Sequence, residues 1–403
     1  MKNRDSLSDV ASAEQRHTFS LVLGGPLFQL LCRARLCDDE LMFAKKRVLI
    51  ISLLAWLPLL ILSVLEGNAL SDKVSISFLL DFEAHLRFLV AIPLFIIAEI
   101  LVHRRLQAVV REFFDRELIP VQQRARFFSA IGSALRLQYA YLPELLILIF
   151  VYAIGILVIW NKYLSLDIAT WYATPTMNGS SLSIAGIWYE FVSLPIFQFL
   201  MLRWLFRVLI WWRFVWQVSR IKLCLLPTHP DRAAGIGFLT YSVTAFAILA
   251  TAHTTVLSGQ IANRIFYQHA SLLDFKLEIA VVCGYLIILF LSPLLFFIGQ
   301  LAEVKRSGLR DFGKYAQHFV KEFDIKWLQA GNVDKKLLLS SSDVQSLADL
   351  GNAYDPVRTM RLIPVTTDIL IALLIAMLIP IAPLLLTLMP LEELAAKLFG
   401  ILF

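Results

Sequence analysis

Several ionisable side chains lie inside long apolar stretches of this sequence, where each costs at least a few kcal/mol if it faces lipid. Such residues pair with one another or line a path for an ion or a polar solute. Five of them fall at corresponding depths, in the third of each stretch that we expect nearest the cytoplasm: Glu99, Glu144, Arg203, Arg207 and Asp368. We interpret this charged layer either as a structural salt-bridge layer with snorkelling arginines or as the gate of an ion or solute pathway.

A second polar group falls toward the opposite ends of these stretches. Glu190 and His253 lie within them, and His253 stands among hydroxyl side chains in the run Thr251–Thr255. A single intramembrane histidine either hydrogen-bonds a neighbouring helix or relays protons. The sequence leaves both interpretations open.

The segment Leu226–Phe238 carries His229, Asp231 and Arg232 among prolines and glycines. These side chains could bind an anion or take part in acid–base chemistry. The two glycines lack the spacing of a phosphate-binding loop, which also requires a Lys-Ser/Thr pair. The alternative interpretation is a stiff turn in which Asp231 caps the helix that follows.

A second signature, Ser340–Asn352, is followed by Asp355–Arg361 at the start of the last apolar stretch. Together with Leu226–Phe238 it resembles segments of an uncharacterised group of bacterial polytopic inner-membrane proteins. The resemblance covers mainly residues 226–238 and 340–364. It implies a bacterial inner-membrane setting, and it implies neither an activity nor functional residues.

The sequence lacks the common signatures of enzymes and cofactor sites. No HExxH, GxSxG, GxxxxGK, paired CxxC or EF-hand pattern occurs in it. Cys32 and Cys37 form a C-x4-C pair, but no further ligands follow at the spacing of a zinc site. We therefore predict no metal and no cofactor, and these absent signatures favour a protein that is not an enzyme.

Membrane-spanning helices are the elements that must position these residues. Hydrophobic residues make up 58% of the chain and charged residues 17%, and the mean hydropathy is +0.71. A span needs roughly 20 mostly apolar residues, and seven stretches qualify: 48–65, 86–102, 141–160, 187–208, 236–257, 279–300 and 363–388. We predict an all-α fold, a polytopic bundle of about seven transmembrane helices with amphipathic cytoplasmic helices.

Lysine and arginine divide unequally between the alternate connections of these helices. Residues 1–47, 103–140, 203–235 and 301–361 hold eight, seven, six and ten of them, and the opposite side holds the remaining six of 37. The positive-inside rule therefore places the N-terminus in the cytoplasm, and seven spans place the C-terminus outside. The last stretch is interrupted by Pro380 and Pro383, so a re-entrant hairpin that returns the tail to the cytoplasm is the alternative.

We expect four parts along the chain: a cytoplasmic segment 1–47, a six-span bundle 48–300 with cytoplasmic loops 103–140 and 209–235, a cytoplasmic helical segment 301–361, and a final helix with an interfacial tail, 362–403. Helical spacing of apolar residues predicts amphipathic helices over 106–118 and 312–327. These would lie on the inner leaflet, meet a partner or pack against the protein's own helix ends. We also expect a short helix from Ser342 that ends at Gly351, and a fourth span that continues from Ile187 to Leu225.

Three functions fit these patterns. The first is a pore or transporter for an ion or small solute that passes the charged layer. The second is a scaffold or sensor that presents its cytoplasmic helices, including Phe319 and Phe323, to a protein partner of unknown identity. The third is a membrane-bound enzyme that uses the loop 226–238. The expected partners are the lipid bilayer and further copies of the chain in a homo-oligomer, and no nucleic acid.

Overall fold

The computed structural model of the chain describes residues 19–22, 24–26, 29, 44–72, 74–153, 169–176, 179–329 and 342–388. Within these residues the chain is almost entirely helical, and its one sheet is the antiparallel pair β1 (Ala173–Thr176) and β2 (Gly179–Leu182). The predicted all-α class is confirmed. Cys32 and Cys37, residues 154–160 of the third expected span, and the tail 389–403 lie outside the described residues.

Five helical segments in the described part are long and apolar enough to cross a membrane: Lys45–Leu65, Phe82–Asp115, Ile184–Val218, Gly237–Gln268 and Leu272–Leu328. A bent pair, Val121–Tyr139 and Tyr141–Ala153, makes a sixth if its two parts form one span, and their axes differ by 46°. The helix Thr367–Leu378 is apolar but shorter. By length and composition these helices are compatible with a multi-pass membrane protein, and the count of seven spans stays a prediction.

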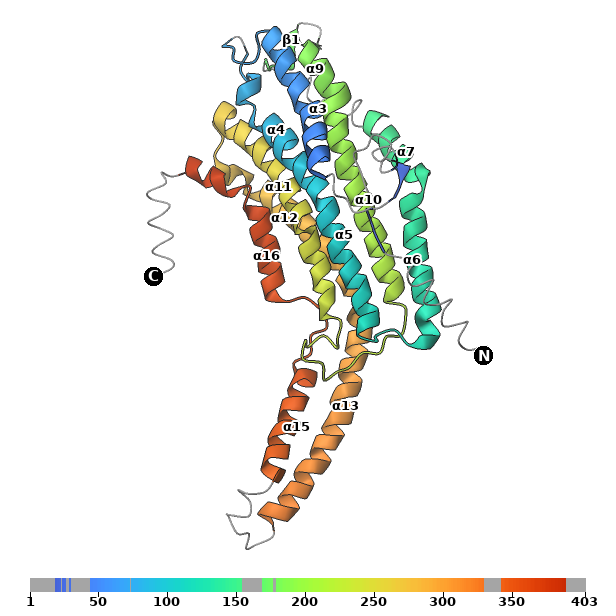
Figure 1. The fold of residues 1–403 in the computed structure, drawn as a ribbon. Helices are drawn as coiled ribbons and strands as arrows, with labels where there is room; N and C mark the ends of the chain where they lie inside the picture. The colour runs from blue at the N-terminus through green and yellow to red at the C-terminus, as the bar shows by residue number, and fades with distance from the viewer. Residues whose placement is uncertain are drawn as a thin grey trace, which may run out of the picture.

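The helices run side by side in a long bundle (Figure 1). The main ones are α3 (Ala44–Leu65), α5 (Ile92–Asp115), α6 (Arg124–Tyr139), α7 (Tyr141–Phe150), α10 (Leu194–Val218), α11 (Thr240–Gln268), α12 (Lys276–Leu291), α13 (Ile298–Phe323), α15 (Ser342–Arg358) and α16 (Thr367–Leu378). Short helices α4 (Phe82–His85) and α9 (Ile184–Trp188) lead into α5 and α10 through π-helical turns. One end of the bundle, here called the sheet end, carries β1 and α9; α13 and α15 project from the other, the hairpin end.

Helix α11 lies in the middle of the bundle and packs against α5, α12 and α16. Its buried residues are rich in alanine, serine, threonine and glycine, which let helix backbones approach closely in a membrane. At Gly259 a Cβ atom would lie 2.9 Å from the Cα of Glu83, so only glycine fits between α11 and α4.

Two prolines illustrate how the bundle satisfies broken backbone hydrogen bonds. A proline within a helix leaves the carbonyl four residues earlier without its usual donor. For Pro380 that carbonyl belongs to Ala376, and it accepts a hydrogen bond from the Thr251 hydroxyl of α11 at 3.0 Å. For Pro195 it belongs to Phe191, and it accepts one from the Tyr152 hydroxyl at 3.2 Å. Neighbouring helices thus replace the missing donors.

The region 106–118, predicted as an amphipathic cytoplasmic helix, is mostly part of a longer helix in the structure. Residues up to Asp115 continue α5 without a break, and Leu106, Val109 and Phe113 are buried in the bundle. The apolar face therefore packs against the protein's own helices, the last of the three predicted alternatives.

Two predicted helix ends are wrong. The fourth helix stops at Val218 rather than Leu225, because the next residues bond elsewhere: Gln300 donates to the carbonyls of Ser219 and Ile221 at 2.6 and 2.7 Å. Helix α15 starts at Ser342 as expected but runs through Gly351 to Arg358. A glycine inside a helix costs only about 1 kcal/mol relative to alanine, so it does not by itself end one.

Candidate functional site

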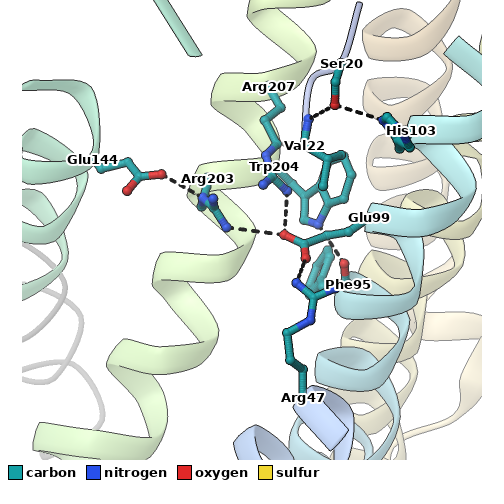
Figure 2. Close-up of polar contacts among 10 residues, drawn as sticks. All are labelled: Ser20, Val22, Arg47, Phe95, Glu99, His103, Glu144, Arg203, Trp204 and Arg207. Carbon is teal, nitrogen blue, oxygen red and sulfur yellow. Dashed lines mark hydrogen bonds and ion pairs between the residues drawn. The ribbon is translucent and has the colours of Figure 1, made fainter. Parts of the chain in front are cut away.

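Four of the five predicted charged residues come together in the bundle, joined by one that the sequence did not single out (Figure 2). We call this set the arginine–glutamate cluster: Arg47, Glu99, Glu144, Arg203 and Arg207. Their side chains are between 2% and 11% exposed. They come from α3, α5, α7 and α10, so the cluster ties four helices together.

Glu99 lies at the centre of the cluster. Its Oε2 accepts a hydrogen bond from Arg47 at 2.5 Å, and its Oε1 accepts from Arg207 at 2.9 Å and from Arg203 at 3.3 Å. Arg203 also donates through Nε to Glu144 at 2.9 Å. Both glutamates that the sequence placed in this layer are therefore engaged by arginine.

The cluster holds more positive than negative charge, with three arginines and two glutamates. Three of its buried guanidinium nitrogens, Nε and Nη2 of Arg47 and Nη2 of Arg207, have no hydrogen-bond partner within the part of the chain that the structure describes. Charges this deeply buried are stable only while their counter-charges remain in place. The cluster therefore holds its four helices together. Removal of one carboxylate would leave buried guanidinium charge without a counter-charge.

Arg47 was missed because it directly precedes an apolar stretch and was counted with the basic N-terminal segment. The signal available was its position as the last of three basic residues, Lys45 to Arg47, at the start of a helix. Asp368, by contrast, does not join the cluster: it is exposed in the first turn of α16, which packs on α11 and α12.

A short N-terminal strap, residues 19–22, covers the cluster on the side of the hairpin end. All four residues are buried, and the ring of Phe19 packs against Trp211 and Phe214 of α10. The Ser20 hydroxyl lies 2.9 Å from Nδ1 of His103 on α5 (Figure 2). The strap thus fills the space between α5 and α10 beyond the cluster.

From the cluster toward the sheet end, the bundle contains a partly open cavity of about 370 Å³ between α5, α10, α11 and α12. Most of its wall is apolar, and we call it the polar cavity after the four polar side chains that line it. Its polar lining includes Arg87, Gln198, His253 and Gln260. Gln198 precedes Arg203 by five residues on α10, which is roughly 7.5 Å along a helix axis. Phe95 lines the cavity too, and its carbonyl accepts a hydrogen bond from the indole of Trp204 at 2.9 Å.

The two predicted intramembrane polar residues separate in the structure. His253 lines the polar cavity, whereas Glu190, although buried, lies in the π-helical turn before α10 and outside the cavity lining. Gln198 and Gln260 were missed because the sequence search considered ionisable residues only. A glutamine within an apolar helix was the signal that could have found them.

In the loop 226–238, Asp231 organises the backbone. Its carboxylate accepts hydrogen bonds from the N–H groups of Ala233, Gly235 and Gly237 at 2.8, 3.1 and 2.9 Å. Burial raises the pKa of Asp231, but these backbone bonds outweigh it and the pKa lies below its ordinary value. His229 Nδ1 lies 2.9 Å from Oδ1 of the same carboxylate. This geometry is that of a stiff turn before α11, the structural alternative for this loop.

The loop is joined to the segment that precedes α16. The N–H of Arg361 donates to the carbonyl of Arg232 at 2.7 Å, and the guanidinium of Arg361 donates to the carbonyl of Asp231 at 2.8 Å. Arg232 itself is half exposed and pairs with Asp355 at 3.4 Å. The two sequence segments that carry the resemblance, distant in the chain, therefore form one junction at the hairpin end.

Comparison of the chain with protein families, with curated proteins and with solved structures found no match.

Proposed function

We propose that the chain is a transporter or pore for a small solute in the bacterial inner membrane, with seven spans and a cytoplasmic N-terminus. The hairpin end then faces the cytoplasm. The observation that carries the proposal is the polar cavity within the membrane-spanning bundle, which shares helices α5 and α10 with the arginine–glutamate cluster. Polar groups within the hydrocarbon are costly, and they mark solute paths in many membrane proteins.

The order of layers along the bundle supports a closed gate. From the sheet end to the hairpin end along α10 come Gln198 of the cavity, then the cluster arginines with Trp204 between them, and then the residues that hold the N-terminal strap. In this proposal a solute moving from the cavity toward the cytoplasm follows α5 and α10, the two helices that the cavity and the cluster share. Because α10 carries both Gln198 and Arg203, a shift of this helix would alter the cavity and the gate at once.

The scaffold and enzyme hypotheses have less support. Phe319 and Phe323 are partly buried on α13, which packs against α15 within the hairpin. In the loop 226–238 the carboxylate of Asp231 is engaged by three backbone N–H groups. Both features have a sufficient explanation in the folding of the chain.

A flux measurement on the purified protein in liposomes tests the proposal. Osmotic swelling reports glycerol and urea, and ion-sensitive dyes report chloride and potassium. We expect at least one of these to cross faster than in protein-free liposomes. Glu144→Gln removes one carboxylate from the cluster and weakens the closed state, so the flux should rise about tenfold for each 1.4 kcal/mol lost.

Glu112→Gln provides the matched control, because Glu112 forms an exposed ion pair with Arg116 on the same helix as Glu99. Its flux should equal that of the unaltered protein. If wild-type protein and Glu144→Gln both insert and remain monodisperse, yet no solute crosses faster than in empty liposomes, the transport proposal fails.

A further inference from the structure

We propose that the polar cavity binds an uncharged solute rich in hydrogen-bond donors, such as a small polyol or amide. This inference rests on the proposed function for the role of the cavity, but binding can be measured without transport. Three properties support this inference: the charge of the cavity wall, the hydrogen-bonding groups of its lining residues and the size of the cavity.

The charge of the cavity wall is balanced. Arg87 is the one charged side chain among the described residues that line it. Its guanidinium pairs with Glu83 and donates to the hydroxyl of Tyr189, and it lies 5.5 Å from the ring centre of Phe197. A charged solute would enter a site without an uncommitted counter-charge, and burial of an unpaired ion costs several kcal/mol. The wall therefore favours a neutral molecule.

Two of the residues that line the cavity, His253 and Gln198, carry hydrogen-bond acceptors. His253 Nδ1 lies 2.7 Å from the carbonyl of Leu249. A carbonyl only accepts, so Nδ1 carries the hydrogen, and in the neutral ring Nε2 is left as an acceptor. Gln198 also lines the cavity. Its Oε1 is enclosed by the protein and has no hydrogen-bond partner among the residues that the structure describes. A buried acceptor without a donor costs about 1–3 kcal/mol, and the inference requires the Gln198 amide to turn toward the cavity so that a bound O–H or N–H group recovers this cost.

The amide of Gln260 completes the polar side of the cavity. Its Nε2 donates to Glu83 at 3.3 Å, so the glutamine is held by the same carboxylate that pairs with Arg87. The remaining wall is largely apolar, with Phe95, Phe197 and Leu286 among its residues. One polar side and one apolar side suit a small molecule with a short carbon frame and several donors.

The size of the cavity suits a small solute. Its volume is about 370 Å³, and a water molecule occupies about 30 Å³ in the liquid. The cavity therefore has room for roughly a dozen non-hydrogen atoms, which is enough for glycerol, erythritol or urea.

Saturation-transfer NMR on the protein in nanodiscs tests the inference. The probes are glycerol, erythritol and urea as neutral donors, and acetate and methylammonium as charged molecules of similar size. We expect transfer to at least one neutral probe and not to the charged ones. Gln198→Leu, which removes the unpartnered acceptor, should weaken binding about tenfold or more, and Gln345→Leu on the exposed face of α15 should leave it unchanged.

A second variant, which introduces a negative charge at the same position, tests the inference if Gln198→Leu fails to fold. Gln198→Glu places a carboxylate in the neutral wall, so it should lose the neutral probe and gain methylammonium. Binding of acetate to the unaltered protein in a Gln198-dependent manner would overturn the inference, as would absence of transfer to every neutral probe. If a neutral probe binds but no solute crosses the membrane, the inference stands and the transport proposal fails. If a solute crosses at a rate that Gln198→Leu does not change, the transport proposal stands and the inference fails.

Discussion

At the scale of single residues, Glu99 has the most demanding position in the molecule. One carboxylate compensates three guanidinium groups, and its side chain is 8% exposed. Removing one partner of a buried ion pair costs more than the pair itself contributes, because the remaining charges stay buried.

We therefore expect Glu99→Gln to destabilise the protein by about 3–5 kcal/mol. Thermal or denaturant unfolding in detergent, followed by tryptophan fluorescence, measures this difference. Glu112→Gln, at an exposed pair on the same helix, should cost at most about 1 kcal/mol. Equal effects of the two substitutions would show that Glu99 is not the centre of a stabilising cluster.

Asp231 allows a prediction about pH. Its pKa is lowered in the folded state, because the gain from three backbone N–H donors exceeds the cost of burial. A lowered pKa contributes stability above the unfolded-state value of about 3.9, and that stability is lost as the pH falls through the folded-state value.

Asp231→Asn should accordingly cost about 1.5–3 kcal/mol at neutral pH. The difference from the unaltered protein should persist from pH 7 to about pH 5 and shrink below about pH 4. Melting curves at several pH values follow it, with Asp355→Asn at an exposed pair as the control. A difference that does not depend on pH would contradict the assigned role of the carboxylate.

Residue-level reasoning from the sequence was most successful where burial leaves few choices. Glu99, Glu144, Arg203 and Arg207 were predicted as one layer because charges at equal depth in a membrane must find one another. Asp368 did not follow this rule, because α16 begins near the end of the bundle where its first turn stays exposed. The polar cavity depends on how α10 and α11 face each other, which no single helix sequence encodes.

At the scale of elements, the hairpin of α13 and α15 is joined to the bundle through a close contact at Gly308. A Cβ at this position would lie 2.7 Å from Cβ of Pro227 and 3.0 Å from Cγ1 of Val357. Gly308 therefore lets α13, the loop 226–238 and α15 meet.

Gly308→Ala should push α15 or the loop away and lower the melting temperature, despite the higher helix propensity of alanine. Gly313→Ala on the same helix is the control, because its Cβ would meet only the Tyr354 hydroxyl at 3.9 Å. That variant should gain up to about 1 kcal/mol. If both alanines stabilise the protein alike, the close contact at Gly308 does not hold the hairpin.

The helix ends were the least predictable features of the elements. Sequence signals placed the start of α15 correctly, because a serine followed by an aspartate favours a helix N-terminus. The end of α10 depends instead on Gln300, about 80 residues later, and on Leu118, whose carbonyl accepts the N–H of Cys224 at 2.8 Å. Such distant partners override local propensity.

At the scale of the whole molecule, connections far apart in the sequence gather at the two ends of the bundle. At the hairpin end, Cys224 bonds to Leu118 and Arg361 bonds to Arg232. At the sheet end, Ile76 forms a bridge with Thr170, and the amide of Asn263 donates to Asp81 at 2.7 Å. This grouping agrees with the alternation of loops from which the distribution of basic residues predicted the topology.

The predicted orientation can be measured with single cysteines in a protein whose four cysteines have been replaced. Asp72→Cys lies in an exposed position at the sheet end, and Gln317→Cys lies in an exposed position on α13. A membrane-impermeant maleimide should label residue 72 in intact cells and residue 317 only after permeabilisation, because the basic hairpin end stays in the cytoplasm. A reporter peptide after Phe403 should be accessible from outside if seven spans cross, and inaccessible if α16 turns back at Pro380 and Pro383. Labelling of residue 317 in intact cells would reverse the topology and, with it, the side of the membrane that the arginine–glutamate cluster faces in the proposed transporter.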